Sequence, residues 1–122
     1  MGVLINKNTK VLVQGITGSA GSFHTKQMLK YGTPVVGGVT PGKGGKKVHS
    51  LPVFNKVSEA CAAVNPDLSI LFVPAPFVKN AAIEALENQL DIVIITEGVP
   101  VKDTLEIISK AKQKNKWLLG PN

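Results

Sequence analysis

The chain has 122 residues, of which 43% are hydrophobic and 18% are charged, and its net charge is +6. This composition is typical of a globular domain and excludes a disordered or low-complexity chain. No apolar run approaches the roughly 18 residues that a membrane span needs, and the single cysteine, Cys61, excludes an internal disulfide framework and a Cys-rich zinc site. Because no secretory signal pattern is visible, we expect a cytoplasmic protein, or a protein of the mitochondrial matrix in a mature eukaryotic form.

Short apolar segments alternate with longer segments of helical character along the chain. We predict strands at 10–14, 34–39, 68–73, 91–95 and 116–119, and helices between them at 19–31, 57–64, 76–89 and 101–114. The strands are apolar on successive residues, which is typical of strands covered on both faces. The fold class that follows is α/β: a Rossmann-like, doubly wound, mostly parallel sheet with helices on both faces.

Apolar residues at helical spacing predict which faces of the helices are buried. His24 is expected to be a packed structural residue and His49 an exposed one. The loop after the second strand is not expected to lead directly into a helix, because Leu51-Pro52 interrupts the sequence between them. The predicted core residues of the first, third and fourth helices are Phe23 and Met28; Phe77, Ala81, Ala82, Ala85 and Leu86; and Val101, Leu105, Ile108 and Ala111.

Positive charge is concentrated in the first half of the chain. The 14 basic residues are all lysines, and residues 1–58 hold eight of them and no carboxylate, whereas residues 59–122 hold six lysines and all 8 acidic residues. This distribution favours an anionic ligand. We do not expect a nucleic acid, because the chain has no arginine and its few aromatic residues form no stacking platform. A small polyphosphate fits better.

The loop Gly15-Ile16-Thr17-Gly18-Ser19-Ala20-Gly21 directly follows the first predicted strand and opens the first predicted helix. Glycines let a backbone approach a phosphate, and a helix N-terminus offers unpaired N–H groups and a partial positive charge. The place of this loop in a β-α-β unit therefore predicts nucleotide binding. At Gly18 we expect that a Cβ would project into the ligand or force an unfavourable φ. The spacing G-x-x-G-x-x-G differs, however, from the dinucleotide pattern G-x-G-x-x-G.

The end of the second predicted strand carries a lysine where an NAD site places Asp or Glu on the ribose. The chain there reads Val39-Thr40-Pro41-Gly42-Lys43 and continues through two more glycines to Lys46 and Lys47. Lys43 and its neighbours therefore favour a ligand with an extra phosphate near the adenosine. The two candidates are NADP and coenzyme A (CoA).

Eight segments spread over the chain form a specific combination. They are Asn8-Thr9-Lys10-Val11, Gly15-x-Thr17-Gly18-x-x-Gly21, Tyr31-Gly32-Thr33, Val36-Gly37-Gly38-Val39-Thr40-Pro41-Gly42-Lys43-Gly44-Gly45, Leu51-Pro52-Val53-Phe54, Phe72-Val73-Pro74-Ala75-Pro76-Phe77, Ile95-Thr96-Glu97-Gly98-Val99-Pro100 and Gly120-Pro121-Asn122. Together they resemble the alpha subunit of succinyl-CoA synthetase (succinate–CoA ligase), and the resemblance covers essentially all 122 residues. ATP-citrate lyase and other acid–CoA ligases share several of these segments.

The resemblance implies that residues 1–122 are a single CoA-binding domain, the N-terminal part of a subunit more than twice as long. We therefore expect the chain to be a truncated form of that subunit. In the family one CoA-binding surface is made from Thr17, Gly18, Ser19 and Ala20, from Lys43, and from Ile95, Thr96 and Glu97. A polar residue such as Gln often stands in the family where this chain has Ala20, so a backbone contact is expected there.

The family's full enzyme forms succinyl-CoA reversibly from succinate and CoA, coupled to ATP or GTP through a phosphorylated histidine. The resemblance places that histidine in a second domain of the alpha subunit, and the nucleotide with magnesium on the beta subunit. In this chain we expect CoA binding without turnover, a beta-subunit partner, no catalytic residue, no metal ligand and no membrane partner. Two alternatives stay open: a CoA-binding domain of another acid–CoA ligase or of ATP-citrate lyase, and an NADP-binding reductase or sensor module.

Overall fold

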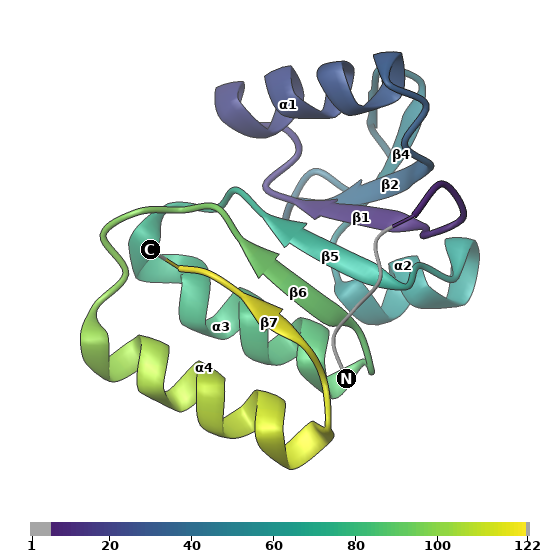
Figure 1. Cartoon of the computed structure of the whole chain (residues 1–122). Helices are drawn as coiled ribbons and strands as arrows, with labels where there is room; N and C mark the ends of the chain where they lie inside the picture. Colours follow the sequence, from purple (N-terminus) through teal and green to yellow (C-terminus); the bar gives the residue numbers. More distant parts are fainter. Residues whose placement is uncertain (1–5, 122) are drawn as a thin grey trace.

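The strands of residues 6–121, which are the residues that the computed structural model describes, form one seven-stranded sheet (Figure 1). In chain order the strands are β1 (Val11–Gln14), β2 (Val35–Val39), β3 (Lys47–Val48), β4 (Leu51–Phe54), β5 (Leu68–Leu71), β6 (Asp91–Ile94) and β7 (Leu118–Leu119). The helices are α1 (Ser19–Lys30), α2 (Val57–Val64), α3 (Ala75–Glu87) and α4 (Val101–Lys114). The bounds predicted for the helices at 57–64 and 101–114 are confirmed.

The strands follow the order β3-β4-β2-β1-β5-β6-β7. β1 lies at the centre, parallel to β2 on one side and to β5 on the other, and in the described sheet only the pair β3–β4 is antiparallel. Helix α1 covers one face beside β1 and β2, and α2, α3 and α4 cover the other face (Figure 1). The predicted α/β fold, Rossmann-like, doubly wound and mostly parallel, is therefore confirmed. No helix between residues 6 and 121 combines the length and apolar character that crossing a membrane requires.

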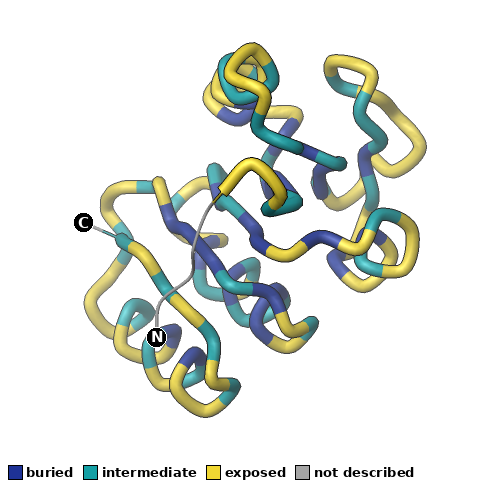
Figure 2. Tube along the Cα trace, turned by 45° about the vertical axis from the view of Figure 1, so that its right-hand side comes forward, coloured by how far each residue is buried: buried dark blue, intermediate teal, exposed yellow. Residues whose placement is uncertain are grey.

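Burial on both faces of the sheet explains the apolar runs of the central strands. All four residues of β1 are buried, and successive side chains of a strand point to opposite faces. Leu12 belongs to the core cluster shared with α2, α3 and α4, whereas Val11 and Val13 belong to a second cluster that includes residues of α1. Figure 2 shows these buried strands between exposed loops. The expected cover on both faces is confirmed for this strand.

The hairpin of β3 and β4 is absent from the prediction, which expected Leu51-Pro52 only to separate the loop after β2 from the next helix. Lys47 pairs with Pro52 and Val48 with Leu51, and β4 then runs parallel to β2 from Val53 onward. Proline is unusual inside a sheet because it has no N–H for the ladder. Pro52 is tolerated because it precedes the residues that pair with β2. Strands as short as β3, two residues, leave no periodic pattern to detect.

The predicted buried faces of the helices are partly wrong. Phe23, Phe77, Val101 and Leu105 are exposed, whereas Ala82, Ala85, Leu86 and Ala111 are buried as predicted. The buried residues that the pattern missed include Thr25 in α1, Val78 in α3 and Ile107 in α4. Neighbouring elements set the rotation of each helix about its axis, and a stripe of apolar residues on a short helix does not determine that rotation.

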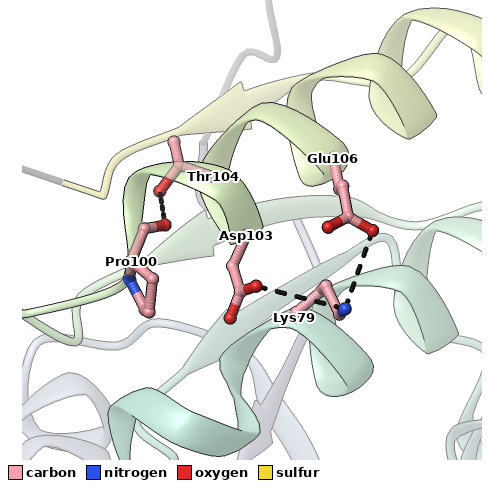
Figure 3. A network of polar contacts seen from close by, with 5 residues as sticks. All are labelled: Lys79, Pro100, Asp103, Thr104 and Glu106. Carbon is pink, nitrogen blue, oxygen red and sulfur yellow. Dashed lines mark hydrogen bonds and ion pairs between the residues drawn. The ribbon is translucent and has the colours of Figure 1, made fainter.

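Ion pairs border the contact between α3 and α4 (Figure 3). Lys79 Nζ lies 3.6 Å from Glu106 Oε1 and 4.0 Å from Asp103 Oδ1. In the first turn of α4, the hydroxyl of Thr104 donates to the carbonyl oxygen of Pro100, at 3.2 Å. Partly exposed ion pairs contribute little to stability. Burial of apolar side chains between these helices and the sheet is the larger contribution.

The turn after β1 is held by Ile16, whose side chain is fully buried. This side chain packs directly on the backbone of Gly38 in β2, and a Cβ added there would lie 2.6 Å from both Cβ and Cδ1 of Ile16. Gly38 therefore provides the space that Ile16 occupies. Because Ile16 belongs to the loop between β1 and α1, this contact fixes the glycine loop (residues 15–21) relative to β2.

Gly38→Ala is expected to lower the free energy of unfolding by about 1–3 kcal/mol, because overpacking a filled core shifts side chains and backbone. Urea unfolding followed by circular dichroism measures the change. In an Ile16→Ala background the further loss on Gly38→Ala should be smaller, since two of the three overlapped atoms are then missing. Unchanged stability of the single variant would contradict this account of the packing.

Candidate functional site

A cavity of about 640 Å³ lies at the carboxyl ends of β1, β2 and β5. One wall is the glycine loop, another is the end of β2 with Thr40 and Pro41, and a third is formed by Phe72, Val73 and the first turns of α3. Ligands of open α/β sheets bind at this edge, where the strand order changes direction. The cavity is therefore the candidate ligand site, and it contains four of the predicted site residues, namely Thr17, Gly18, Ser19 and Ala20.

Each glycine of this loop stands at its position for a different structural reason. Gly15 takes a positive φ of 84°, and its N–H donates to the carbonyl oxygen of Val39 at 2.8 Å. Gly21 lies against this turn, where a Cβ would overlap the carbonyl oxygen of Gly15. Gly18 has an ordinary φ of −74°, and the nearest atom to an added Cβ, Gly15 O, is 3.5 Å away. The expectation of an unfavourable φ at Gly18 is therefore wrong, and only the cavity accounts for a glycine at this position.

Backbone N–H groups at the start of α1 are the candidate anion-binding element of the cavity. Gly18 is the N-cap residue, and no side chain among the described residues caps the helix. The N–H of Gly18 itself donates to Gly15 O at 3.1 Å. The next three N–H groups, of Ser19, Ala20 and Gly21, have no acceptor within the helix. With the helix dipole, these three groups suit a phosphate.

Two polar side chains of the cavity are already hydrogen-bonded within the protein. Gln14 is 2% exposed; its Nε2 donates to Ala81 O at 3.3 Å, and its Oε1 accepts from Ser69 Oγ at 2.7 Å. Glu84 Oε2 accepts the N–H of Val57 at 2.7 Å, at the start of α2, where the helix dipole stabilises a carboxylate. The wall beside these groups is formed by aromatic, valine and proline side chains. Such a surface suits a flat, largely apolar group.

Lys43 lies outside the cavity lining, in the lysine loop (residues 40–46) that follows β2. The first residue of this loop, Thr40, does line the cavity. Thr17 Oγ1 donates to Thr40 Oγ1 at 3.0 Å, which joins the lysine loop to the glycine loop. The structure thus brings the loop of Lys43 beside the cavity. Contact of the lysine itself with a ligand stays a prediction.

The segment of Ile95, Thr96 and Glu97 lies at the same edge, next to the cavity and outside its lining. Ile95 directly follows β6, and its N–H donates to Leu71 O at 3.2 Å. Thr96 Oγ1 donates to the carbonyl oxygen of Val73 at 2.6 Å, and Val73 lines the cavity. Glu97 is exposed. The segment follows β6, on the side of the sheet edge opposite the lysine loop, and Thr96 connects it to the cavity wall.

The order of the strands explains this arrangement. Four segments form this edge: the lysine loop, the glycine loop, the segment that begins at Phe72 and the segment that begins at Ile95. They follow β2, β1, β5 and β6, which are consecutive neighbours in the sheet. Three spacings between neighbouring strands amount to about 14 Å. The predicted residues therefore lie along a line at one edge, with the cavity near its middle. An elongated ligand fits this line, whereas a small anion would use only one part of it.

The remaining titratable residues near the site have structural surroundings. The sequence predicts a packed His24, but the residue is exposed. Its ring nevertheless stacks on Phe72, with 5.2 Å between the ring centroids. His49 is exposed as predicted, and its Nε2 lies 3.0 Å from the carbonyl oxygen of Ser22. Burial raises the pKa of the Cys61 thiol, and the charge of Glu84 raises this pKa further, which keeps the thiol protonated. Among residues 6–121 no cluster of three or more His, Cys, Asp or Glu could hold a metal ion.

A family model described as a CoA binding domain matches residues 6–98. The chain belongs to this family. It is also similar to two proteins named succinate–CoA ligase [ADP-forming] subunit alpha, or alpha 1. That of Archaeoglobus fulgidus is 53% identical over 98% of this chain, and that of Aquifex aeolicus 52% identical over 100% of it. This chain spans only 42% and 41% of the lengths of these two relatives.

Solved structures show the same fold at low sequence identity. ATP citrate lyase from Methanothrix soehngenii, in complex with citrate and coenzyme A, has a TM-score of 0.83 at 24% identity over 98% of this chain and 21% of that chain. Dihydrodipicolinate reductase from Paenisporosarcina has a TM-score of 0.75 at 16% identity, over 93% of this chain and 47% of that chain. A lyase and a reductase thus share this architecture, so the fold alone does not decide the ligand.

Gly18→Val is expected to abolish CoA binding while the melting temperature stays within a few degrees, because the backbone at this position accepts a side chain and only the cavity does not. Gly21→Ala should instead act on stability. It should lower the melting temperature, since its Cβ overlaps the backbone of Gly15. Calorimetric titration and thermal unfolding of both variants measure the two effects. A Gly18→Val protein that still binds CoA would contradict the assignment of the cavity.

Proposed function

We propose that this chain is the CoA-binding domain of a succinate–CoA ligase alpha subunit. The observation that carries the proposal is the identity of about half of the residues, over essentially the whole chain, to proteins of that name. The site supports it independently. The glycine loop, the lysine loop and a largely apolar cavity lie side by side at one edge of the sheet, and CoA has a pyrophosphate, an additional phosphate and a purine base in one molecule.

The proposed placement of CoA follows from the chemistry of each part of the site. The pyrophosphate would bind to the N–H groups of Ser19, Ala20 and Gly21 at the start of α1. The adenine ring would enter the cavity, whose valine, proline and aromatic side chains suit a flat base. The phosphate on the ribose would face Lys43, and the pantetheine arm would extend past Val73 toward Thr96 and Glu97. This direction follows the line of strand ends from β2 to β6.

In this proposal the chain binds CoA, and the phosphate-transfer chemistry belongs to other parts of the enzyme. Both histidines of the described residues have local partners: His24 stacks on Phe72, and His49 is hydrogen-bonded to Ser22. Neither has a carboxylate partner that would prepare it for phosphorylation. The phosphohistidine would lie in the remainder of the alpha subunit, and ATP or GTP with magnesium would bind to a beta subunit. The acid substrate would be succinate.

Isothermal titration of the chain with CoA, NADP and ATP tests the ligand. We expect CoA to bind and the other two to bind at least about tenfold more weakly, because only CoA combines both phosphate positions with an arm for the β6 end. Binding should weaken as salt is raised, since the lysine-rich half contributes to the attraction. Tighter binding of NADP than of CoA would favour the reductase alternative and contradict the proposal.

Lys43→Ala is expected to weaken CoA binding by about 1–2 kcal/mol, the cost of losing one charge-assisted hydrogen bond, which is roughly 5- to 30-fold in Kd. Dephospho-CoA, which lacks the phosphate on the ribose, should lose much less. Lys26→Ala, at an exposed lysine of α1 in the same lysine-rich half of the chain, is the control for general loss of positive charge. Equal losses for CoA and dephospho-CoA would show that Lys43 does not bind this phosphate.

A further inference from the structure

The lysine loop consists of two consecutive turns that meet at Lys43. The N–H of Lys43 donates to Thr40 O at 3.0 Å, and the N–H of Lys46 donates to Lys43 O at 3.2 Å. Each turn contains a glycine with a positive φ, 85° at Gly42 and 90° at Gly45. Lys43 is thus the last residue of one turn and the first residue of the next. Glycine-rich turns of this kind are flexible unless other groups hold them.

One side chain holds both sides of Lys43. Asn55 Oδ1 accepts the N–H of Gly42 at 2.8 Å and the N–H of Gly44 at 2.9 Å. These two residues directly precede and follow Lys43. A carboxamide oxygen with two acceptor positions can accept both bonds at once. The bonds fix the peptide groups on either side of the lysine, although Asn55 is 12 positions away in the sequence.

Asn55 is itself held at a rigid position. It directly follows β4, whose last residue, Phe54, accepts the N–H of Thr40 at 3.0 Å. The N–H of Asn55 donates to Glu59 Oε1 at 3.3 Å, in the first turn of α2. The side chain therefore connects the lysine loop to the junction of a strand and a helix. The Thr17–Thr40 hydrogen bond holds the start of the loop. Its end is held by backbone hydrogen bonds, from Gly45 N–H to Val53 O and from Val53 N–H to Lys46 O, both at 3.0 Å. Asn55 thus holds the middle of the loop, from Gly42 to Gly44, which contains Lys43.

We propose that Asn55 is a positioning residue for Lys43, and so a determinant of the preference for a ligand with a phosphate on the ribose. The proposal rests on the proposed function, since it assumes that Lys43 faces this phosphate of CoA. Asn55 acts through the backbone of the loop and needs no contact with the ligand. By ordering the loop before binding, it removes the entropy cost that a mobile lysine loop would add to phosphate binding.

Gly44 provides an independent way to break the same contact. Its φ is not positive, and an added Cβ would lie 2.6 Å from Nδ2 and 2.9 Å from Oδ1 of Asn55. The carboxamide is at the end of a flexible side chain, so it would move away and lose its two hydrogen bonds. Gly44→Ala should therefore act like Asn55→Ala. In the double variant the Cβ meets no carboxamide, so the two effects should not add.

The test measures the ratio of the affinities for CoA and dephospho-CoA by calorimetric titration of the whole chain. We expect Asn55→Ala and Gly44→Ala each to lower this ratio by about three- to tenfold, with dephospho-CoA affinity nearly unchanged. Asn55→Asp keeps an acceptor oxygen in place. Hydrogen exchange of the Gly42 and Gly44 amides should become faster in Asn55→Ala and stay slow in Asn55→Asp, whatever the new charge does to CoA binding.

The outcomes separate this proposal from the proposed function. The placement of CoA would be overturned if the wild-type protein showed no preference for CoA over dephospho-CoA. It would also be overturned if Lys43→Ala kept that preference. A wild-type preference that Lys43→Ala removes and Asn55→Ala retains would overturn only the role of Asn55. Equal losses for both ligands in Asn55→Ala would also overturn it, because they would indicate general damage to the fold. Lys26→Ala, at an exposed lysine of α1 outside the lysine loop, is the control that keeps the preference.

Discussion

Close contact between the first βα turn and the neighbouring strand β2 is the constraint on which the site depends. Ile16 fills the space above Gly38, and the N–H of Gly15 donates to Val39 O at 2.8 Å. The first contact requires a backbone without a side chain at Gly38, and the second is made by Gly15, whose positive φ of 84° favours glycine. They place the first turn of α1 over the end of β2. The unpaired N–H groups of the helix and the lysine loop are consequently neighbours.

The fold class could be predicted because it depends on a pattern that extends over the whole chain. Apolar strands such as β1 must be covered on both faces, and alternation with helices then leaves a parallel sheet as the simple solution. The β3–β4 hairpin could not be predicted, since its strands are very short and Pro52 argues against a strand. The missed buried residues Val78 and Ile107 reflect packing between α3 and α4, which involves residues far apart in the sequence.

The candidate site divides in the same way. The glycine loop has a local signature, so the position of Thr17, Gly18, Ser19 and Ala20 at the sheet edge could be predicted from the sequence alone. The cavity wall contributed by α3 has no local signature, because Phe77 and Glu84 resemble an ordinary apolar residue and an ordinary surface acid. Asn55 was missed for a related reason: it follows the strand β4 that the prediction lacked. Long-range hydrogen bonds of single side chains are visible only in three dimensions.

In the proposed function, phosphate selection would depend on which polar groups of the site already have hydrogen-bond partners and which do not. Both polar atoms of the Gln14 side chain are engaged by Ser69 and Ala81, and Glu84 Oε2 is engaged by the N–H of Val57, so these atoms are less available to a ligand. The charge of Glu84 is balanced by the start of α2, which keeps a negative group tolerable near an anionic ligand. Available donors remain at the start of α1 and on the lysine loop. In the proposed function, selectivity would then depend on the distance between these two donor groups, which the contacts between the glycine loop, β2 and the lysine loop keep constant.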